Sequence, residues 1–88
     1  MTNNYSFKVN EESSIFCNDI VSEMTRLFGI SSSEAVGRIN RQWDGVDFLA
    51  KDDLRYHETI EFWANTIYYG ADSYWWINPP NLKPKPFP

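Results

Sequence analysis

The sequence predicts a compact, mainly α-helical single domain over residues 1–88. The length suffices for one domain, three segments carry apolar residues at helical spacing, and those segments are bounded by residues that start or stop helices. Around the helices we expect short extended or β segments, an N-terminal arm at 1–10 and a Pro-rich tail at 78–88.

The first helix is predicted from Glu11 to Phe28. Glu11 and Glu12 suit the positive end of the helix dipole, and Arg26 suits the negative end. Gly29 is well placed to stop the helix in the left-handed conformation. The apolar residues form one stripe: Phe16, Cys17, Ile20, Val21, Met24, Leu27 and Phe28.

The second helix is predicted from Ser32 to about Trp43. Ser31 and Glu34 have the spacing of a capping box, in which each side chain binds a free backbone N–H. The turn pair Asp44-Gly45 would end the helix. Its apolar face comprises Ala35, Val36, Ile39 and Trp43.

The third helix is predicted at 59–69, with Thr59 as its cap and Gly70 as its end. Residues 46–58 are compatible with two short strands or with an ordered loop. The five prolines of the chain all lie in the tail 78–88, which therefore cannot be helical and favours an extended, polyproline-like path. The predicted core is Phe16, Ile20, Met24, Leu27, Val36, Ile39, Trp43, Trp63 and Ile67.

The net charge of −4 disfavours nucleic acid and anionic membranes, because both attract Lys and Arg. The single cysteine excludes an intramolecular disulfide, and the N-terminal residues lack the charged and apolar regions of a signal peptide. The longest apolar run, 74–77, is too short to span a bilayer. We therefore expect a cytoplasmic protein that acts without a membrane.

The segment 27–36 resembles a DNA-binding helix-turn-helix, whose turn often carries Gly, an apolar residue and Ser. Arg38 and Arg41 would then face the major groove. The apolar position of the second helix falls one residue late, at Val36, and the chain is acidic. An ordinary helical hairpin with a Gly stop and a Ser cap is the favoured interpretation, and a DNA-binding regulator using 16–43 stays the alternative.

His57 and Glu61 are the one pair with metal-ligand spacing, since they are four residues apart and could share a helix face. The chain has one histidine, so further ligands would have to be carboxylates such as Asp52 and Asp53. A helix start at His57, with Glu61 complementing the dipole, explains the pattern more simply.

Cys17 lies in the apolar stripe, where a buried thiol is inert. We expect no enzyme, no cofactor and no metal.

Aromatic residues are the most unusual feature, with four Trp, five Tyr and six Phe in the chain. Many fall in a late block: Phe62, Trp63, Tyr68, Tyr69, Tyr74, Trp75 and Trp76. Adjacent Trp75 and Trp76 point to opposite sides of an extended chain. Part of the block is then exposed and forms a protein-binding hot spot, a stacking platform or a self-association face, unless the tail packs over it and completes the core.

The C-terminal third resembles a signature of short uncharacterised bacterial proteins. The residues that carry the resemblance are Tyr56-His57-Glu58, Glu61, Trp63-Ala64, Ile67-Tyr68-Tyr69-Gly70, Trp75-Trp76 and Leu82-Lys83-Pro84. In size and acidity such proteins are similar to immunity or accessory proteins that neutralise toxins. The resemblance assigns no functional residues.

The sequence therefore favours a small acidic protein-binding module of the immunity or antitoxin kind. Acidic residues, including Asp47, would speed encounter with a basic partner, and aromatic residues would supply affinity. A homodimer is a further candidate assembly. The predicted partner-binding residues are Asp52, Asp53, Tyr56, His57, Glu58, Glu61, Phe62, Trp75 and Trp76.

Overall fold

The longest element is helix α1, Glu11–Phe28, in a computed structural model that describes residues 5–88. The side chain of Asn10 caps α1 by accepting the backbone N–H of Ser13, while the Ser13 hydroxyl accepts the backbone N–H of Asn10. Gly29 ends the helix with a left-handed φ of 68°. The predicted bounds of this helix and its glycine stop are confirmed.

Helix α2 spans Ser32–Gln42, and the Ser31 hydroxyl accepts the backbone N–H of Glu34 as predicted. The Glu34 carboxylate instead accepts a hydrogen bond from Arg38 Nε at 2.8 Å. The helix ends at Gln42, one residue before the predicted end, and Trp43 is its C-cap.

Helix α3 spans Ile60–Tyr69, is capped by Thr59 and ends at Gly70, as predicted. Two short 3₁₀ helices flank it: η1 at Leu54–His57 and η2 at Trp75–Ile77.

Residues 46–58 form an ordered loop that ends in η1, so the structure selects one of the two predicted alternatives. One isolated parallel bridge pairs Phe48 with Val9 of the N-terminal arm, and the backbone N–H of Phe48 donates to the carbonyl of Lys8 at 2.8 Å. The arm is thereby joined to this loop. The first four residues of the predicted arm 1–10 lie outside the described residues.

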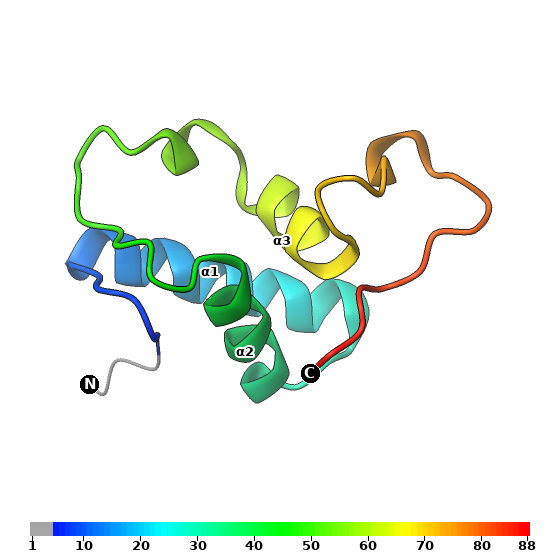
Figure 1. Ribbon diagram of the computed structural model, residues 1–88, viewed down its shortest axis with the longest axis horizontal. Helices are drawn as coiled ribbons and strands as arrows, with labels where there is room; N and C mark the ends of the chain where they lie inside the picture. The colour runs from blue at the N-terminus through cyan, green and yellow to red at the C-terminus, as the bar shows by residue number, and fades with distance from the viewer. Residues whose placement is uncertain (1–4) are drawn as a thin grey trace.

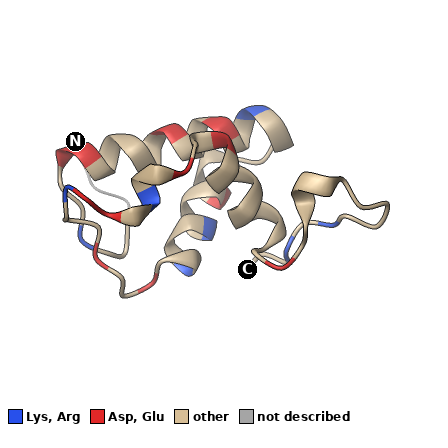
Figure 2. Cartoon of the chain, turned by 90° about the horizontal axis from the view of Figure 1, so that it is seen from above, with Lys and Arg blue, Asp and Glu red and all other residues tan. Residues whose placement is uncertain are grey.

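Helices α2 and α3 pack against α1. Helix α1 runs along the long axis of the molecule, which measures 38 × 26 × 22 Å (Figure 1). Helices α2 and α3 both cross α1 at a large angle (Figure 2). Acidic residues are spread along α1, with Arg26 in its last turn (Figure 2). Within residues 5–88, no helix is both long and apolar enough to cross a lipid bilayer.

The core combines helix faces with residues from irregular segments. Phe7 of the arm is 3% exposed, and Phe48 of the loop is fully buried. The other buried hydrophobic residues are Cys17, Ile20, Met24, Ala35, Ile39, Trp43, Ala64 and Ile67.

Several predicted core residues lie further out than expected. Leu27 is 37% exposed, so its assignment to the core is wrong. In the last turn of α1 it is Phe28 that packs, because its ring stacks on that of Tyr68 with a centroid distance of 3.8 Å. Three other predicted core residues are only partly buried: Phe16, Val36 and Trp63.

Candidate functional site

Asp53, one of the predicted partner-binding residues, is engaged within the chain. Both Asp53 carboxylate oxygens accept hydrogen bonds from the Arg55 side chain, at 2.7 and 2.9 Å, and Oδ1 also accepts the backbone N–H of Arg55. These hydrogen bonds hold the pKa of the Asp53 carboxyl below its ordinary value. Asp53 therefore caps η1 and is paired with Arg55, and its assignment to a partner surface stays a prediction.

Tyr56 is likewise a packing residue. Its ring lies edge-on to Phe16 at 5.0 Å and tilted against Phe48 at 4.9 Å. The ring is partly buried in this cluster, and its assignment as a partner-binding anchor stays a prediction. Within the 3₁₀ turn of η1, Leu54 is exposed and Tyr56 is directed inward.

His57 and Glu61 belong to different elements, because η1 ends at His57 and α3 begins at Ile60. The proposed shared helix face is therefore wrong. Among the described residues, no group of three or more His, Cys, Asp or Glu side chains lies close enough to hold a metal ion. The exposed members of the predicted set in this region are Asp52, His57, Glu58 and Glu61.

The late aromatic block divides into a partly buried and an exposed part. The stacked pair Phe28 and Tyr68 joins α1 to α3, and Tyr69 meets the same Phe28 ring edge-on at 5.5 Å. The indole N–H of Trp63 donates to the carbonyl of Arg55 at 2.8 Å. These rings contribute to the packing between helices rather than to a partner surface.

The exposed part lies on residues 71–84, which we call the aromatic loop. Tyr74, Trp76 and Ile77 are 59%, 55% and 66% exposed. The Tyr74 and Trp76 rings are 5.6 Å apart between centroids, so they form a contiguous patch. Figure 1 shows this loop projecting from the body beyond the end of α3.

Trp75 holds the aromatic loop to α3. Its indole N–H donates to Thr66 Oγ1 at 3.0 Å, and its ring meets Phe62 at 6.0 Å. Trp75 thus points inward while its neighbour Trp76 points outward. The predicted opposition of the two tryptophans assumed an extended chain, whereas both lie in the 3₁₀ helix η2 with their ring centroids 5.8 Å apart. Trp75 is partly buried, and Trp76 is exposed.

The backbone of the aromatic loop is strained on both sides of η2. Tyr74 and Asn78 have φ values of 54° and 51°, in the left-handed region that non-glycine residues rarely adopt. The loop is closed at its base, where the backbone N–H of Lys85 donates to the carbonyl of Tyr68 at 2.8 Å. Surface loops with adjacent ends and strained residues are frequently functional.

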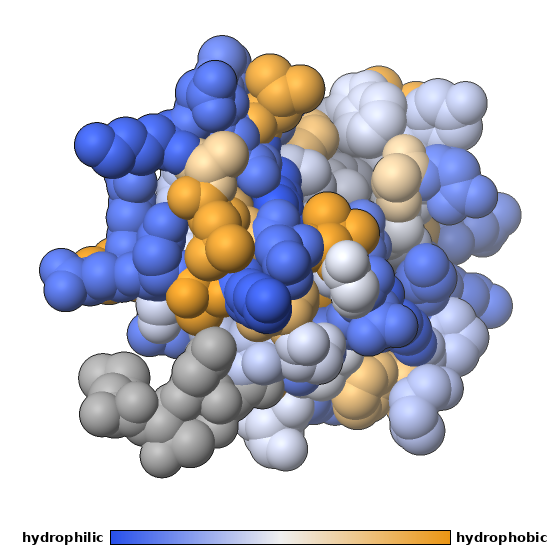
Figure 3. Space-filling view, turned by 60° about the vertical axis from the view of Figure 1, so that its left-hand side comes forward, coloured by the Kyte–Doolittle hydropathy of each residue, from blue (hydrophilic) through white to orange (hydrophobic). Residues whose placement is uncertain are grey.

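A second apolar surface lies at the opposite end of the long axis, on the loop before η1 (Figure 1). Three large side chains are exposed there: Val46, Leu49 and Leu54. Figure 3 turns this end forward and shows hydrophobic atoms interspersed with hydrophilic ones. This surface was not predicted from the sequence. The three apolar residues, which lie in a segment without helical periodicity, could have indicated it.

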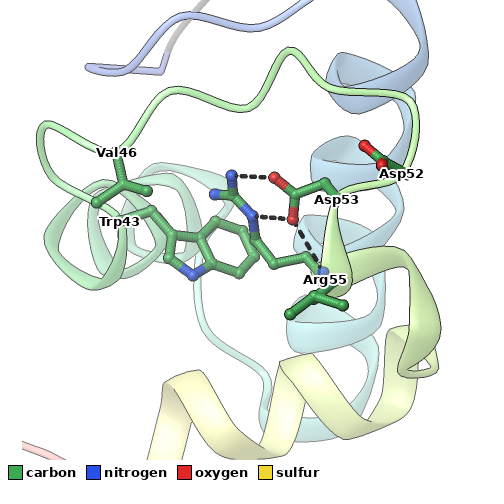
Figure 4. Close-up of a pocket in the computed structure, with 6 residues that line it drawn as sticks. Trp43, Val46, Asp52, Asp53 and Arg55 are labelled. Carbon is green, nitrogen blue, oxygen red and sulfur yellow. Dashed lines mark hydrogen bonds and ion pairs between the residues drawn. The ribbon is translucent and has the colours of Figure 1, made fainter.

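A shallow hollow of about 470 Å³ accompanies this second surface. Trp43, Val46 and Leu54 line it with Asp52 and the ion pair of Asp53 and Arg55 (Figure 4). The Arg55 guanidinium lies over Phe48, 3.7 Å from the ring centroid. The Arg55 side chain thereby packs against Phe48 of this loop.

Arg38 is buried rather than presented to DNA. It is 4% exposed, and its guanidinium donates to the Glu34 carboxylate and to the backbone carbonyl of Lys85. The prediction that Arg38 would face a major groove is therefore wrong. Arg41 donates to the carbonyl of Pro86, so the second cation of that hypothesis also contacts the tail.

Cys17 is completely buried, as expected for an inert thiol. Burial raises the pKa of the Cys17 thiol to about 12, against the opposing influence of the positive charge on Arg55. The reactive thiolate is therefore scarce at neutral pH.

No family model, curated protein or solved structure matches this chain. The function of the candidate site is therefore inferred from its geometry.

Proposed function

We propose that this chain is a small, acidic, non-catalytic protein-binding module of the cytoplasm, whose aromatic loop inserts into a partner protein. The observation that carries the proposal is the exposure of Tyr74, Trp76 and Ile77 on one loop. Exposed apolar clusters of this kind are typical of binding surfaces, and Trp and Tyr are enriched among the residues that dominate binding energy.

The loop is anchored before it meets a partner, which favours binding. Trp75 is hydrogen-bonded to Thr66, and Lys85 is hydrogen-bonded to Tyr68 at the base. An ordered loop loses less conformational entropy on association than a disordered one. The strained φ values of Tyr74 and Asn78 support the same interpretation, because the fold maintains them to present η2.

The charge of the chain favours a basic partner. Glu58 and Glu61 are exposed at the start of α3, and Asp72 is exposed within the aromatic loop. With a net charge of −4, these acids would accelerate encounter with a positively charged surface. A toxin that binds nucleic acid is one class of basic partner, which makes an immunity or antitoxin role a specific form of this proposal.

The experiment is affinity capture from a lysate of the native source, with three forms of the full chain. We expect a basic protein to be retained by the wild type and lost with Tyr74→Ala/Trp76→Ala. The matched control is Val46→Ala/Leu54→Ala, which removes two exposed apolar side chains at the other end of the molecule. Equal capture by all three forms would refute the placement of the interface on the aromatic loop.

A further inference from the structure

The C-terminal tail occupies a groove built by α2 and the end of α3. Gly37 forms the floor of this tail groove, and Arg38, Arg41 and Tyr68 form its walls. The Phe87 ring lies so close to Gly37 that a Cβ at that position would overlap it. Figure 1 shows the tail returning to the body near α2 after the excursion of the aromatic loop.

The groove recognises the tail by its backbone as well as by its aromatic ring. The backbone N–H of Lys85 donates to the carbonyl of Tyr68 at 2.8 Å. Arg38 Nη1 donates to the carbonyl of Lys85 at 2.7 Å, and Arg41 Nη1 donates to the carbonyl of Pro86. The two guanidinium groups also lie over the Phe87 ring, at 5.3 and 5.4 Å from its centroid. Cation–π contacts of this kind add to the hydrogen bonds.

These contacts define a ligand: an extended Lys-Pro-Phe segment. Each contact is made to a short stretch of chain, so it can be made equally to a segment that arrives from another molecule. The connection at 78–84 is mostly exposed and contains three prolines, Pro79, Pro80 and Pro84, which favour an extended course. Seven residues span up to ~25 Å when extended, which is enough to reach a neighbouring molecule.

We propose that the tail groove also binds the Lys85-Pro86-Phe87 segment of a second copy of this chain, so that two chains exchange tails. A second copy is the occupant because it carries the one segment that the structure shows to fit. Exchange keeps every groove contact and changes only which chain supplies the tail. Since the tail of the same chain has an effective concentration in the mM range, the wild type at micromolar concentration is mainly monomeric.

Two complementary substitutions in the full-length chain, one in the tail and one in the groove, test the exchange. Phe87→Ala leaves the groove intact and weakens the binding of the tail to it. Gly37→Leu fills the floor of the groove and releases an intact tail, with Leu a favourable residue in a helix. We expect each variant alone to be monomeric by sedimentation equilibrium, and an equal mixture to form a one-to-one heterodimer at least tenfold tighter than either variant with itself.

The control mixture combines Phe87→Ala with the double variant Gly37→Leu/Phe87→Ala, which supplies no intact tail, and we expect it to stay monomeric. Monomers in the first mixture, with both variants retaining helical circular dichroism, would overturn the proposal. If Gly37→Leu does not fold, a synthetic peptide of residues 82–88 added to Phe87→Ala replaces it as the ligand. Failure of that peptide to bind would overturn the proposal as well.

The exchange does not depend on the exposed ring of Trp76. Trp76→Ala in both chains leaves the expected heterodimer unchanged, because Trp76 does not contribute to the tail groove. Loss of partner capture and loss of tail exchange can therefore be told apart.

Discussion

The ring of Phe87 lies directly on the α-carbon of Gly37, where a side chain as small as a methyl group would overlap it. The two residues are far apart in the sequence, and their contact seats the tail on α2. Gly37 thus serves close approach rather than a special backbone conformation, since it lies within an ordinary α-helix.

Replacing Gly37 with Ala tests this contact. In an exposed helix interior Gly→Ala stabilises by up to ~1 kcal/mol, but here the added methyl group displaces Phe87. We expect the amide of Lys85, which donates to Tyr68, to lose its protection from hydrogen exchange. Ser33→Ala, on an exposed position of the same helix, is the control and should leave that protection unchanged. A protected Lys85 amide in Gly37→Ala would show that the ring does not seat the tail.

Arg38→Ala should be among the most destabilising single substitutions. The change leaves the Lys85 carbonyl without its buried donor and removes the ion partner of Glu34. We expect a loss of about 2–4 kcal/mol in the free energy of unfolding by urea. Arg38→Lys should recover less than half of it, because an ammonium lacks the planar fork that reaches both partners. Arg41→Ala, with an exposed side chain, should cost about 1 kcal/mol or less. Equal effects of Arg38→Ala and Arg41→Ala would contradict the buried role of Arg38.

Asp53 should make stability dependent on acid pH. The hydrogen bonds from Arg55 lower the pKa of Asp53 in the folded state below the value of about 3.9 expected for the unfolded chain. The folded state therefore binds fewer protons than the unfolded chain. The contribution of the Asp53–Arg55 pair to the free energy of unfolding is present above about pH 4 and is lost as the pH falls through the pKa of Asp53 in the folded state.

The corresponding measurement compares urea midpoints at pH 7 and pH 3. We expect Asp53→Asn to be less stable than the wild type at pH 7, with a smaller difference at pH 3. Asp52→Asn, at the exposed neighbouring position, should match the wild type at both pH values. If the difference in urea midpoint between the wild type and Asp53→Asn grew toward low pH, the account of the Asp53–Arg55 ion pair would be contradicted.

Cys17 should react only when the protein unfolds. The thiol is fully buried, and burial raises its pKa to about 12. We expect a disulfide reagent at pH 8 to modify the native protein at least a hundredfold more slowly than the urea-unfolded chain. Similar rates in the two states would mean that the face of α1 bearing Cys17 opens readily.

The helices follow from local patterns in the sequence, whereas the loops do not. The stripe of α1 and the Gly29 stop are local signals, and so is the Ser31 cap of α2. Phe48 and Tyr56 belong to segments without periodicity, so their inward orientation depends on rings contributed by other segments.

The candidate site was predictable only in part. The aromatic block could be recognised from the sequence, but the 3₁₀ helix that orients Trp75 and Trp76 could not. The burial of Arg38 could not, because it depends on a backbone carbonyl at Lys85, distant in the sequence. The sequence left open whether the tail covers the aromatic residues, whereas in the structure the tail docks on α2 and Trp76 is exposed.

The most direct test of the aromatic loop follows the four tryptophan indole N–H signals by NMR while the captured partner is added. Trp76 reports on the aromatic loop, and Trp43 reports on the hollow at the other end of the molecule. Trp63, which lies outside the aromatic loop, is the internal reference, because its indole N–H group is already hydrogen-bonded to the carbonyl of Arg55. We predict the largest shift for Trp76 and no change for Trp43. A shifted Trp43 with an unchanged Trp76 would place the interface on the hollow and contradict the proposed function of the aromatic loop.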